Sequence, residues 1–202
     1  MEVKNVVEVL RSKGYQVYYT NTVTETRSLL MELIKRNDTV GFGGSATLDE
    51  IGIGDALKER GNTVYCRRLM PDTEPYEVMK KAMFADWFVT STNALTEQGE
   101  FVNTDGTCNR IAAQVFGGEN TVFVLGVNKI VPALGDAFER INHEAAKKNC
   151  LRFGFHNNPC VTGGNCKDCP PETCICSATT VIHKPPKLKK MYVVIVNKDL
   201  GF

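Results

Sequence analysis

The chain has 202 residues, of which 43% are apolar and 23% are charged, a composition that is typical of a folded globular domain and excludes a disordered chain. Its 24 lysines and arginines are balanced by 23 aspartates and glutamates, so the net charge of +1 gives no reason to expect binding to nucleic acid or to an anionic membrane surface. Every apolar run is far shorter than the roughly 20 residues of a membrane-spanning helix, and the mixed charge of the N-terminus is unlike a signal peptide. We therefore expect a cytoplasmic protein with a single domain over residues 1–202.

Helical and extended patterns alternate along the chain. Apolar residues at helical spacing predict helices over residues 3–10, 22–34, 47–61, 75–85, 109–116 and 132–145. Short valine-rich runs predict strands over residues 15–19, 39–42, 62–66, 87–90, 121–125, 179–182 and 192–196. Capping-box patterns place the starts of the second and third helices at Thr22 and Thr47, and Gly52 makes the third helix less regular. The alternation predicts an α/β fold of three layers, with a mostly parallel sheet that the last strand joins and helices on both faces.

A glycine-rich turn, Gly41-Phe-Gly-Gly-Ser45, follows the second predicted strand and precedes a helix. Glycines let a backbone approach a ligand closely, and amides at a helix start attract phosphate or carboxylate. The carboxyl ends of parallel strands, where this turn should lie, are the usual place for ligands in such sheets. The spacing fits neither the phosphate-binding P-loop nor the dinucleotide-binding pattern, so a tight connection without a ligand is an equal alternative.

The segment from Thr90 to Arg110 is far more polar than the strands around it. Gln-Gly at 98–99 and Asp-Gly at 105–106 are turn signals on either side of an apolar pair, which predicts a hairpin-like excursion. Turns followed by a helix cap would account for part of the pattern. The segment also gathers groups that could orient a small polar substrate and move protons, namely Thr92, Asn93, Glu97, Asn103, Asp105 and Arg110.

Five of the eight cysteines fall within 17 residues near the C-terminus, in a segment over residues 149–178 that lacks apolar periodicity. A loop of this length in a compact domain needs something to organise it. In a cytoplasmic protein, metal coordination by thiolates is a better explanation than disulfides, and thiolates suit either iron–sulfur clusters or zinc. Free redox-sensitive thiols are the alternative. Cys66, Cys108 and Cys150 are scattered, and we expect them to be structural.

Four stretches together resemble the lactate-utilisation (LUD) domain family: residues 43–52, residues 92–116, Leu-Gly-Val-Asn-Lys-Ile at 125–130, and Asn-Lys-Asp-Leu-Gly-Phe at 197–202. The resemblance covers nearly the whole chain. It implies a fold similar to that of ribose-5-phosphate isomerases and CoA transferases. It also implies a role in the oxidation of lactate to pyruvate, or of a related 2-hydroxy acid.

The resemblance directs the assignment of site residues. An acidic catalytic residue follows a comparable strand in the isomerase and transferase relatives, which implies that Glu97 is a base or nucleophile. The other residues that we assign to catalysis are Asn93, Asp105 and Arg110. The residues that we assign to ligand binding are Gly43, Gly44, Ser45, Thr47, Thr92, Asn103, Gly106 and Asn109. Cys108 departs from the family pattern, because we expect a glycine at that position.

The family also informs the cysteine cluster. LUD proteins that the chain resembles have a similar cysteine arrangement, which implies that the metal ligands are Cys160, Cys166, Cys169 and Cys176. Because the implied pathway is a redox pathway, we favour a [4Fe–4S] cluster over structural zinc. The pattern leaves open whether Cys174 or His156 joins the site.

The expected partners are a small anionic substrate and an iron–sulfur or flavin redox protein, with no nucleic acid and no membrane. The sequence leaves open whether the chain forms a homo-oligomer. Two other functions stand beside the leading one. The first is a metal-independent isomerase or transferase for a phosphorylated sugar or a CoA ester. The second is a non-enzymatic subunit of a redox complex in which zinc holds the cysteine loop together.

Overall fold

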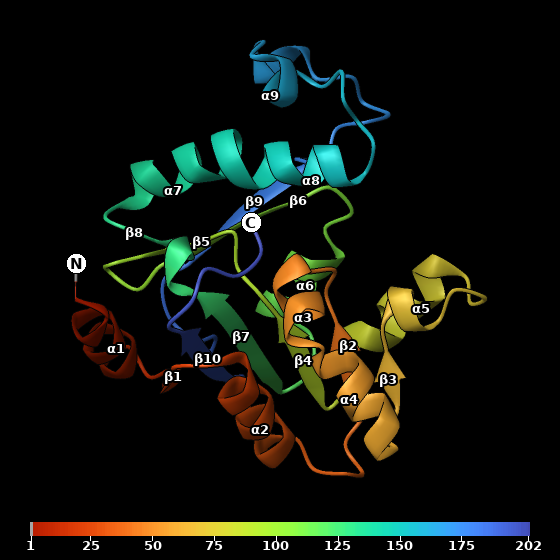
Figure 1. The fold of residues 1–202 in the computed structure, drawn as a ribbon, viewed down its shortest axis with the longest axis vertical. Coiled ribbons are helices and arrows are strands. Elements are labelled where there is room, and N and C mark those ends of the chain that lie inside the picture. Colours follow the sequence, from red (N-terminus) through yellow and green to blue (C-terminus); the bar gives the residue numbers. More distant parts are fainter. Residues whose placement is uncertain (1) are drawn as a thin grey trace.

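The computed structural model of the protein describes residues 2–202, apart from the side chain of residue 167. Within this range the chain forms two sheets (Figure 1). The larger sheet is six-stranded in the described chain and has the order β1-β10-β7-β4-β2-β3, with every neighbouring pair parallel. Its strands are β1 (Gln16–Thr20), β2 (Val40–Phe42), β3 (Val64–Tyr65), β4 (Trp87–Thr90), β7 (Asn120–Gly126) and β10 (Lys190–Val196). The prediction of a mostly parallel sheet that the last strand joins is therefore confirmed.

The first six helices of the described chain lie against the larger sheet, whereas the last three lie over the smaller sheet or beyond it. The helices are α1 (Val3–Ser12), α2 (Val23–Leu33), α3 (Ala46–Ile51), α4 (Ile53–Arg60), α5 (Pro75–Met83), α6 (Asn109–Val115), α7 (Leu134–Arg140), α8 (Ala146–Arg152) and α9 (Pro159–Thr162). Short 3₁₀ turns are η1 (Arg67–Leu69), η2 (Val127–Lys129) and η4 (Cys166–Asp168), and a π-helical turn, η3 (Ile141–Ala145), joins α7 to α8.

Side chains of β7 and β10 alternate between two hydrophobic cores, because successive residues of a strand point to opposite faces. Val122 and Val124 contribute to a core that α2, α3 and α4 cover. Phe123 and Leu125 contribute to a second core, which α1 and strands of the smaller sheet cover. On this second face α5 also lies directly against β2. Burying each such large apolar side chain stabilises the fold by roughly 1.5–3 kcal/mol.

The smaller sheet has the order β8-β5-β6-β9, with strands β5 (Ala94–Thr96), β6 (Phe101–Asp105), β8 (Ile130–Val131) and β9 (Ala178–Ile182). Strands β5 and β6 form the hairpin expected from the turn signals. Helices α7 and α8 pass over this sheet (Figure 1), and Ala137 and Ile141 pack against Ala94 and Val102. We did not predict that the smaller sheet covers part of the second face of the larger sheet, because its strands are too short for their pairing partners to be recognised from the sequence.

The third predicted helix differs from the prediction in two respects. The helix expected over residues 47–61 is divided at Gly52, whose φ of 70° ends α3 and precedes α4. Its capping residue is Ser45, whose hydroxyl accepts a hydrogen bond from the Leu48 amide at 3.4 Å, so the capping box expected at Thr47 is wrong. Thr47 is fully buried and bonds elsewhere. Thr22 is confirmed as the helix cap, because its hydroxyl accepts a hydrogen bond from the Glu25 amide, whereas the Glu25 carboxylate accepts from the amide of Asn21 rather than that of Thr22.

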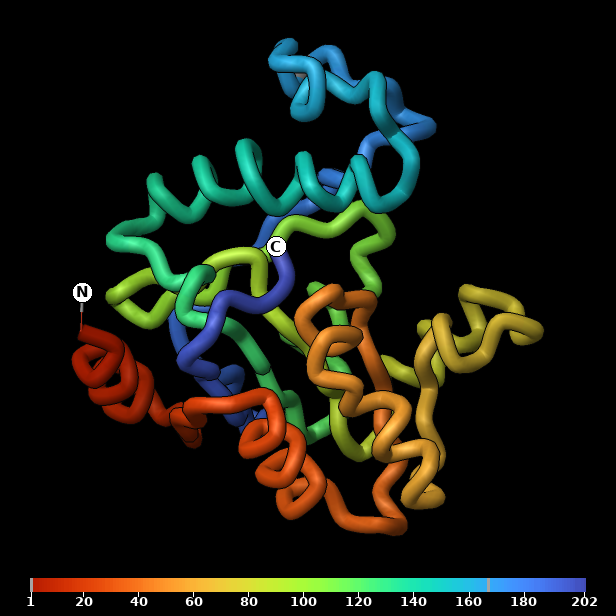
Figure 2. The backbone as a smooth tube through the Cα atoms, viewed as in Figure 1, coloured from red at the N-terminus to blue at the C-terminus, as the bar shows by residue number. Residues whose placement is uncertain are grey.

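The cysteine-rich segment, residues 149–178, begins inside α8 and contains α9 and η4, so it has more regular structure than its composition indicates. The helix expected to end near residue 145 continues because Ala146 and Cys150 remain on a buried face. Figure 2 shows the segment projecting from the body of the protein beyond the end of α8. No helix within residues 2–202 has the length and apolar character needed to cross a membrane.

Candidate functional site

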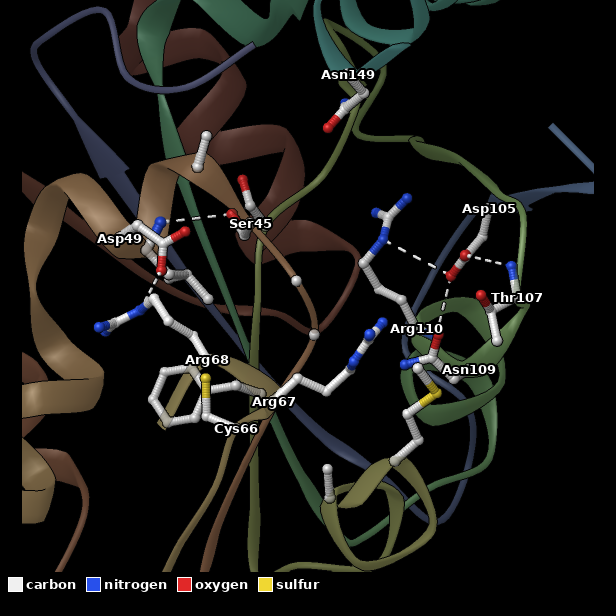
Figure 3. A pocket seen from close by; sticks show the side chains of 18 of the residues that line it. Ser45, Asp49, Cys66, Arg67, Arg68, Asp105, Thr107, Asn109, Arg110 and Asn149 are labelled. Carbon is white, nitrogen blue, oxygen red and sulfur yellow. Dashed lines mark hydrogen bonds and ion pairs between the residues drawn. The ribbon is translucent and has the colours of Figure 1, made fainter. Parts of the chain in front are cut away.

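A pocket of about 680 Å³ lies at the carboxyl ends of β2 and β4 (Figure 3). Its walls come from the glycine turn before α3, from the residues after β4, from the β6–α6 turn and from the segment around η1. The carboxyl edge of a parallel sheet is where ligands bind in such folds. Predicted site residues that line it are Gly43, Gly44, Ser45, Thr92, Asn93, Asp105, Gly106, Asn109 and Arg110.

Arg110 is the centre of the hydrogen-bond network on one side of the pocket. Its guanidinium donates to Oδ1 of Asn103 at 2.7 Å, to Oδ1 of Asn93 at 3.0 Å and to the carbonyl of Thr104 at 2.7 Å. Its Nε lies 3.8 Å from a carboxylate oxygen of Asp105. Burial lowers the pKa of Arg110 and the charge of Asp105 opposes this shift, but arginine keeps its proton in proteins. The structure therefore brings together four residues that the sequence analysis had selected.

Gly43 makes room for this arginine. A Cβ at Gly43 would lie 3.0 Å from Cγ of Arg110, which is closer than ordinary van der Waals contact. On the other side, the backbone amide of Arg110 donates to the Asp105 carboxylate at 3.0 Å, as does that of Thr107 at 3.2 Å. Asp105 thus shapes the turn before α6 and also contributes charge to the pocket.

Lys129 is a functional candidate that the sequence analysis missed. It follows β7 in the η2 turn and lines the pocket, although the residue is only 4% exposed. Its Nζ lies 2.9 Å from the hydroxyl of Thr47, 3.2 Å from the hydroxyl of Ser91 and 3.2 Å from the carbonyl of Thr92. A signal was present, because the motif over residues 125–130 contains this lysine directly after an apolar strand.

The environment of Lys129 favours the uncharged amine. Burial is the main reason that its pKa falls to about 7, and the positive charges of Arg140 and Arg110 lower it further. Glu50 acts in the opposite direction. A lysine with such a pKa is partly uncharged at neutral pH, which makes its amine available as a base or a nucleophile.

Glu97 lies away from this pocket. It follows β5 in the hairpin turn, whereas Asn93, which lines the pocket, precedes the same strand. The backbone amide of Glu97 donates to the carbonyl of Val131, which extends the smaller sheet. The strand thus carries the chain away from the pocket before Glu97 is reached, and the structure does not place this carboxylate with the other predicted site residues.

The pocket is rich in positive charge. Its described lining contains four arginines, at positions 67, 68, 110 and 152, against the carboxylates of Asp49 and Asp105. Arg68 forms ion pairs with Asp49 and with Asp55, and Asp105 lies beside Arg110. The side chain of Arg67 extends toward the Arg110 side of the pocket (Figure 3) and makes no hydrogen bond or ion pair with any described residue. The arrangement is suited to an anionic ligand.

Thiols gather in the cysteine-rich segment. The Sγ atoms of Cys150 and Cys160 lie 3.6 Å apart. Burial and a hydrogen bond with Cys150 raise the pKa of Cys160 to about 11, and burial and a hydrogen bond with Cys174 raise that of Cys169 to about 11. Burial raises the pKa of Cys176 to about 12. Among the described residues, no three histidine, cysteine or acidic side chains are arranged as a metal site, so metal binding stays a prediction.

The cysteine-rich segment adjoins the pocket. Ile175 lines the pocket, and its backbone lies 3.0 Å from the position that a Cβ on Gly106 would take. The amide of Ser177 donates to the carbonyl of Asp105 at 3.1 Å. A second cavity of about 30 Å³, roughly the space of one water molecule, lies between Asn93 and Cys176. The cysteines are therefore next to the wall that carries Asp105.

Comparisons with known proteins agree on the fold. A family model for the LUD domain matches residues 3–196. The structure is also similar to the crystal structure of a DUF162 family protein from Deinococcus radiodurans, with a TM-score of 0.55 and 11% sequence identity over 96% of this chain and 95% of that chain. At this identity the likeness concerns the fold alone. No curated protein matches the sequence.

Proposed function

Because the chain belongs to the LUD domain family, we propose that it takes part in the oxidation of lactate or a related 2-hydroxy acid, and that its pocket binds this acid or the 2-oxo acid formed from it. The observation that carries the proposal is the guanidinium of Arg67, which extends into the pocket without a partner among the described residues. A guanidinium binds a carboxylate through two parallel hydrogen bonds. Arg110 adds positive charge on the opposite wall.

The pocket offers separate groups for the two ends of such an acid. Arg67 is the group for the carboxylate, and the hydroxyl of Ser91, which lines the pocket beside Lys129, is a group for the oxygen on the second carbon. A volume of about 680 Å³ is in the range of pockets for drug-sized ligands, so a three-carbon acid fills only part of it. The remaining space would admit an electron-accepting group, which we assign to an iron–sulfur or flavin partner protein.

The same proposal includes a metal centre in the cysteine-rich segment. Clustered thiols are the donors that iron–sulfur clusters and zinc require. Burial, and after it the neighbouring thiols, raise their pKa values, and a bound cation would favour the thiolate forms instead. We assign Cys160, Cys166, Cys169 and Cys176 as the ligands. A [4Fe–4S] cluster there would supply one-electron transfer beside the pocket, because Cys176 and Asn93 line the same small cavity.

Calorimetric titration with lactate, pyruvate and the neutral analogue lactamide tests the binding proposal. We expect the two anions to bind and lactamide to bind at least tenfold more weakly, because the neutral amide loses the charge-assisted bonds to Arg67. Arg67→Gln should weaken the binding of both anions by about tenfold, a loss of roughly 1.4 kcal/mol of binding free energy. Arg36→Gln is the matched control, since this exposed arginine lies outside the pocket. Equal binding by wild type and Arg67→Gln would refute the assignment.

Metal analysis after purification without oxygen tests the second part. Iron and acid-labile sulfide in near-stoichiometric amounts, lost in Cys166→Ser, would support the cluster. Zinc alone would favour the alternative of a subunit whose cysteine-rich segment is held together by a structural metal. If the purified protein contains neither iron nor zinc, both assignments are contradicted.

A second candidate is an isomerase or transferase for a phosphorylated sugar or a CoA ester. The observation that favours it is the size of the pocket together with its excess of positive charge. Adding ribose 5-phosphate and acetyl-CoA to the titration panel separates the two candidates. Tight binding of either, with no response to lactate or pyruvate, would replace the leading proposal.

A further inference from the structure

We propose that the amine of Lys129 forms a covalent imine with a 2-oxo acid in the pocket. The inference rests on the proposed function, because it concerns the same pocket and the product of the same oxidation. Lys129 is almost fully buried from solvent, yet it lines the pocket. The side chain is therefore sheltered from bulk water and borders the space that a ligand would fill, and both conditions favour a nucleophilic lysine.

The hydrogen-bond partners of Lys129 suit an uncharged amine as well as an ammonium. Two of the three are the hydroxyls of Thr47 and Ser91, and a hydroxyl can either donate or accept. The carbonyl of Thr92 accepts only. A neutral amine can thus donate to the carbonyl and to one hydroxyl while its lone pair accepts from the other. When the lone pair attacks a ligand, the hydroxyl that it releases still has a second oxygen within reach, because Ser91 Oγ lies 3.4 Å from Thr47 Oγ1.

Lys189 shows that burial of a lysine does not by itself produce this arrangement. Its Nζ donates to the carbonyls of Ala113 at 3.1 Å and Gly118 at 2.6 Å, and a carbonyl cannot donate to a lone pair. Burial lowers its pKa as well, to about 8, but it does not line the pocket. Lys189 is therefore a matched control within the same chain.

The charges around Lys129 favour the same step. Arg110 and Arg140 face it and disfavour a third positive charge, while Glu50 is the opposing carboxylate. A 2-oxo acid held by its carboxylate at Arg67 would bring one negative charge into this cationic pocket. Its electrophilic carbonyl carbon is directly bonded to that carboxylate, so the group that anchors the acid also limits where the carbon can lie.

The reaction needs no oxidant. The nitrogen lone pair of Lys129 attacks the carbonyl carbon, and a proton passes from nitrogen to the carbonyl oxygen to give a carbinolamine. Loss of the hydroxyl as water, with the second nitrogen proton, leaves a carbon–nitrogen double bond. The hydroxyls of Thr47 and Ser91 lie beside the nitrogen and are placed to carry these protons. The adduct would acidify the protons on the carbon next to the imine carbon, since the protonated imine accepts their electrons.

Reductive trapping tests the inference. Purified protein is incubated with pyruvate and sodium cyanoborohydride, and the intact mass and the peptide map are recorded. We expect one reduced adduct at Lys129 and none at Lys189. Lys129→Arg keeps the positive charge but should form no adduct, and Lys189→Arg should react like wild type. The map of the wild-type protein decides the question even if a variant fails to fold, because it reports each lysine separately.

A second readout is deuterium exchange at the methyl group of pyruvate in heavy water, which the imine should accelerate and Lys129→Arg should abolish. Titration of the same protein with pyruvate separates this inference from the proposed function. Pyruvate that binds without an adduct at Lys129 and without accelerated exchange would refute the imine and leave the binding proposal intact. Pyruvate that does not bind would refute both.

Discussion

Replacing Cys108 with glycine should stabilise the protein. Within the described chain, Cys108 is the single non-glycine residue with a positive φ, at 64°. The turn between β6 and α6 forces this conformation, because the Asp105 carboxylate accepts hydrogen bonds from the amides of both Thr107 and Arg110. A left-handed conformation costs an L-residue roughly 1–2 kcal/mol. Glycine avoids that strain but loses about 0.5–1 kcal/mol through greater freedom when unfolded.

The expected net gain of Cys108→Gly is therefore about 0.5–1 kcal/mol, which corresponds to a rise in Tm of roughly 1–4 °C for a chain of this size. The substitution removes a weak hydrogen bond from the thiol to the Asp105 carbonyl, whose length of 3.7 Å makes its contribution small. Cys108→Ala is the decisive control, since it removes the same thiol and keeps the Cβ that causes the strain. Thermal melting under reducing conditions compares the variants. An alanine variant as stable as the glycine variant would refute the reasoning.

Three further predictions concern stability and binding. Gly41→Ala should destabilise the fold by at least about 2 kcal/mol in urea unfolding, because the new Cβ would lie 2.0 Å from the Ala82 carbonyl oxygen. Gly135→Ala is the control, since nothing lies within 4 Å of its new Cβ, and it should stabilise the fold by about 0.5 kcal/mol. Equal effects of the two substitutions would contradict the contact argument. Because the pKa of Lys129 falls from 10.5 to about 7, the unfolded chain binds more protons between these values, so this residue adds stability as the pH rises. In urea unfolding, the free energy of unfolding of wild type relative to that of Lys129→Met should rise by on the order of 1 kcal/mol per pH unit between about pH 7 and pH 9. A difference between the two proteins that does not change with pH would contradict the pKa shift. Arg110→Lys should weaken pyruvate binding in calorimetry by about tenfold, since lysine cannot replace a planar donor that bonds three oxygens; unchanged affinity would show that the network does not shape the pocket.

The sequence predicted most helices and strands, because their periodicity is local, but it could not predict how they are arranged. Nothing in the run over residues 192–196 shows that β10 lies between β1 and β7. The predicted break in regularity at Gly52 is confirmed, since its φ of 70° ends a helix. Ser45 replaced Thr47 as the cap because the buried hydroxyl of Thr47 bonds Lys129, a contact across 82 positions of sequence.

The site was predictable where its residues adjoin one turn. Asn103, Asp105 and Arg110 are close in sequence, and the hairpin brings Asn93 to them. Glu97 was chosen by analogy with other enzymes, and the direction of β5 determines where it lies. Lys129 was missed because its low pKa depends on burial and on distant arginines, neither of which is visible in its neighbours along the chain.

The position of β10 between β1 and β7 affects how the chain can fold during synthesis. Strand β1, near the N-terminus, pairs only with β10 among the described strands, and β10 follows every other strand in sequence. Until residues 190–196 leave the ribosome, β1 has no neighbour and the edge of β7 is open. An incomplete chain should therefore expose an unpaired strand edge, which promotes aggregation. We expect α1 and β1 to be held by a chaperone, or to remain unstructured, until β10 inserts between β1 and β7.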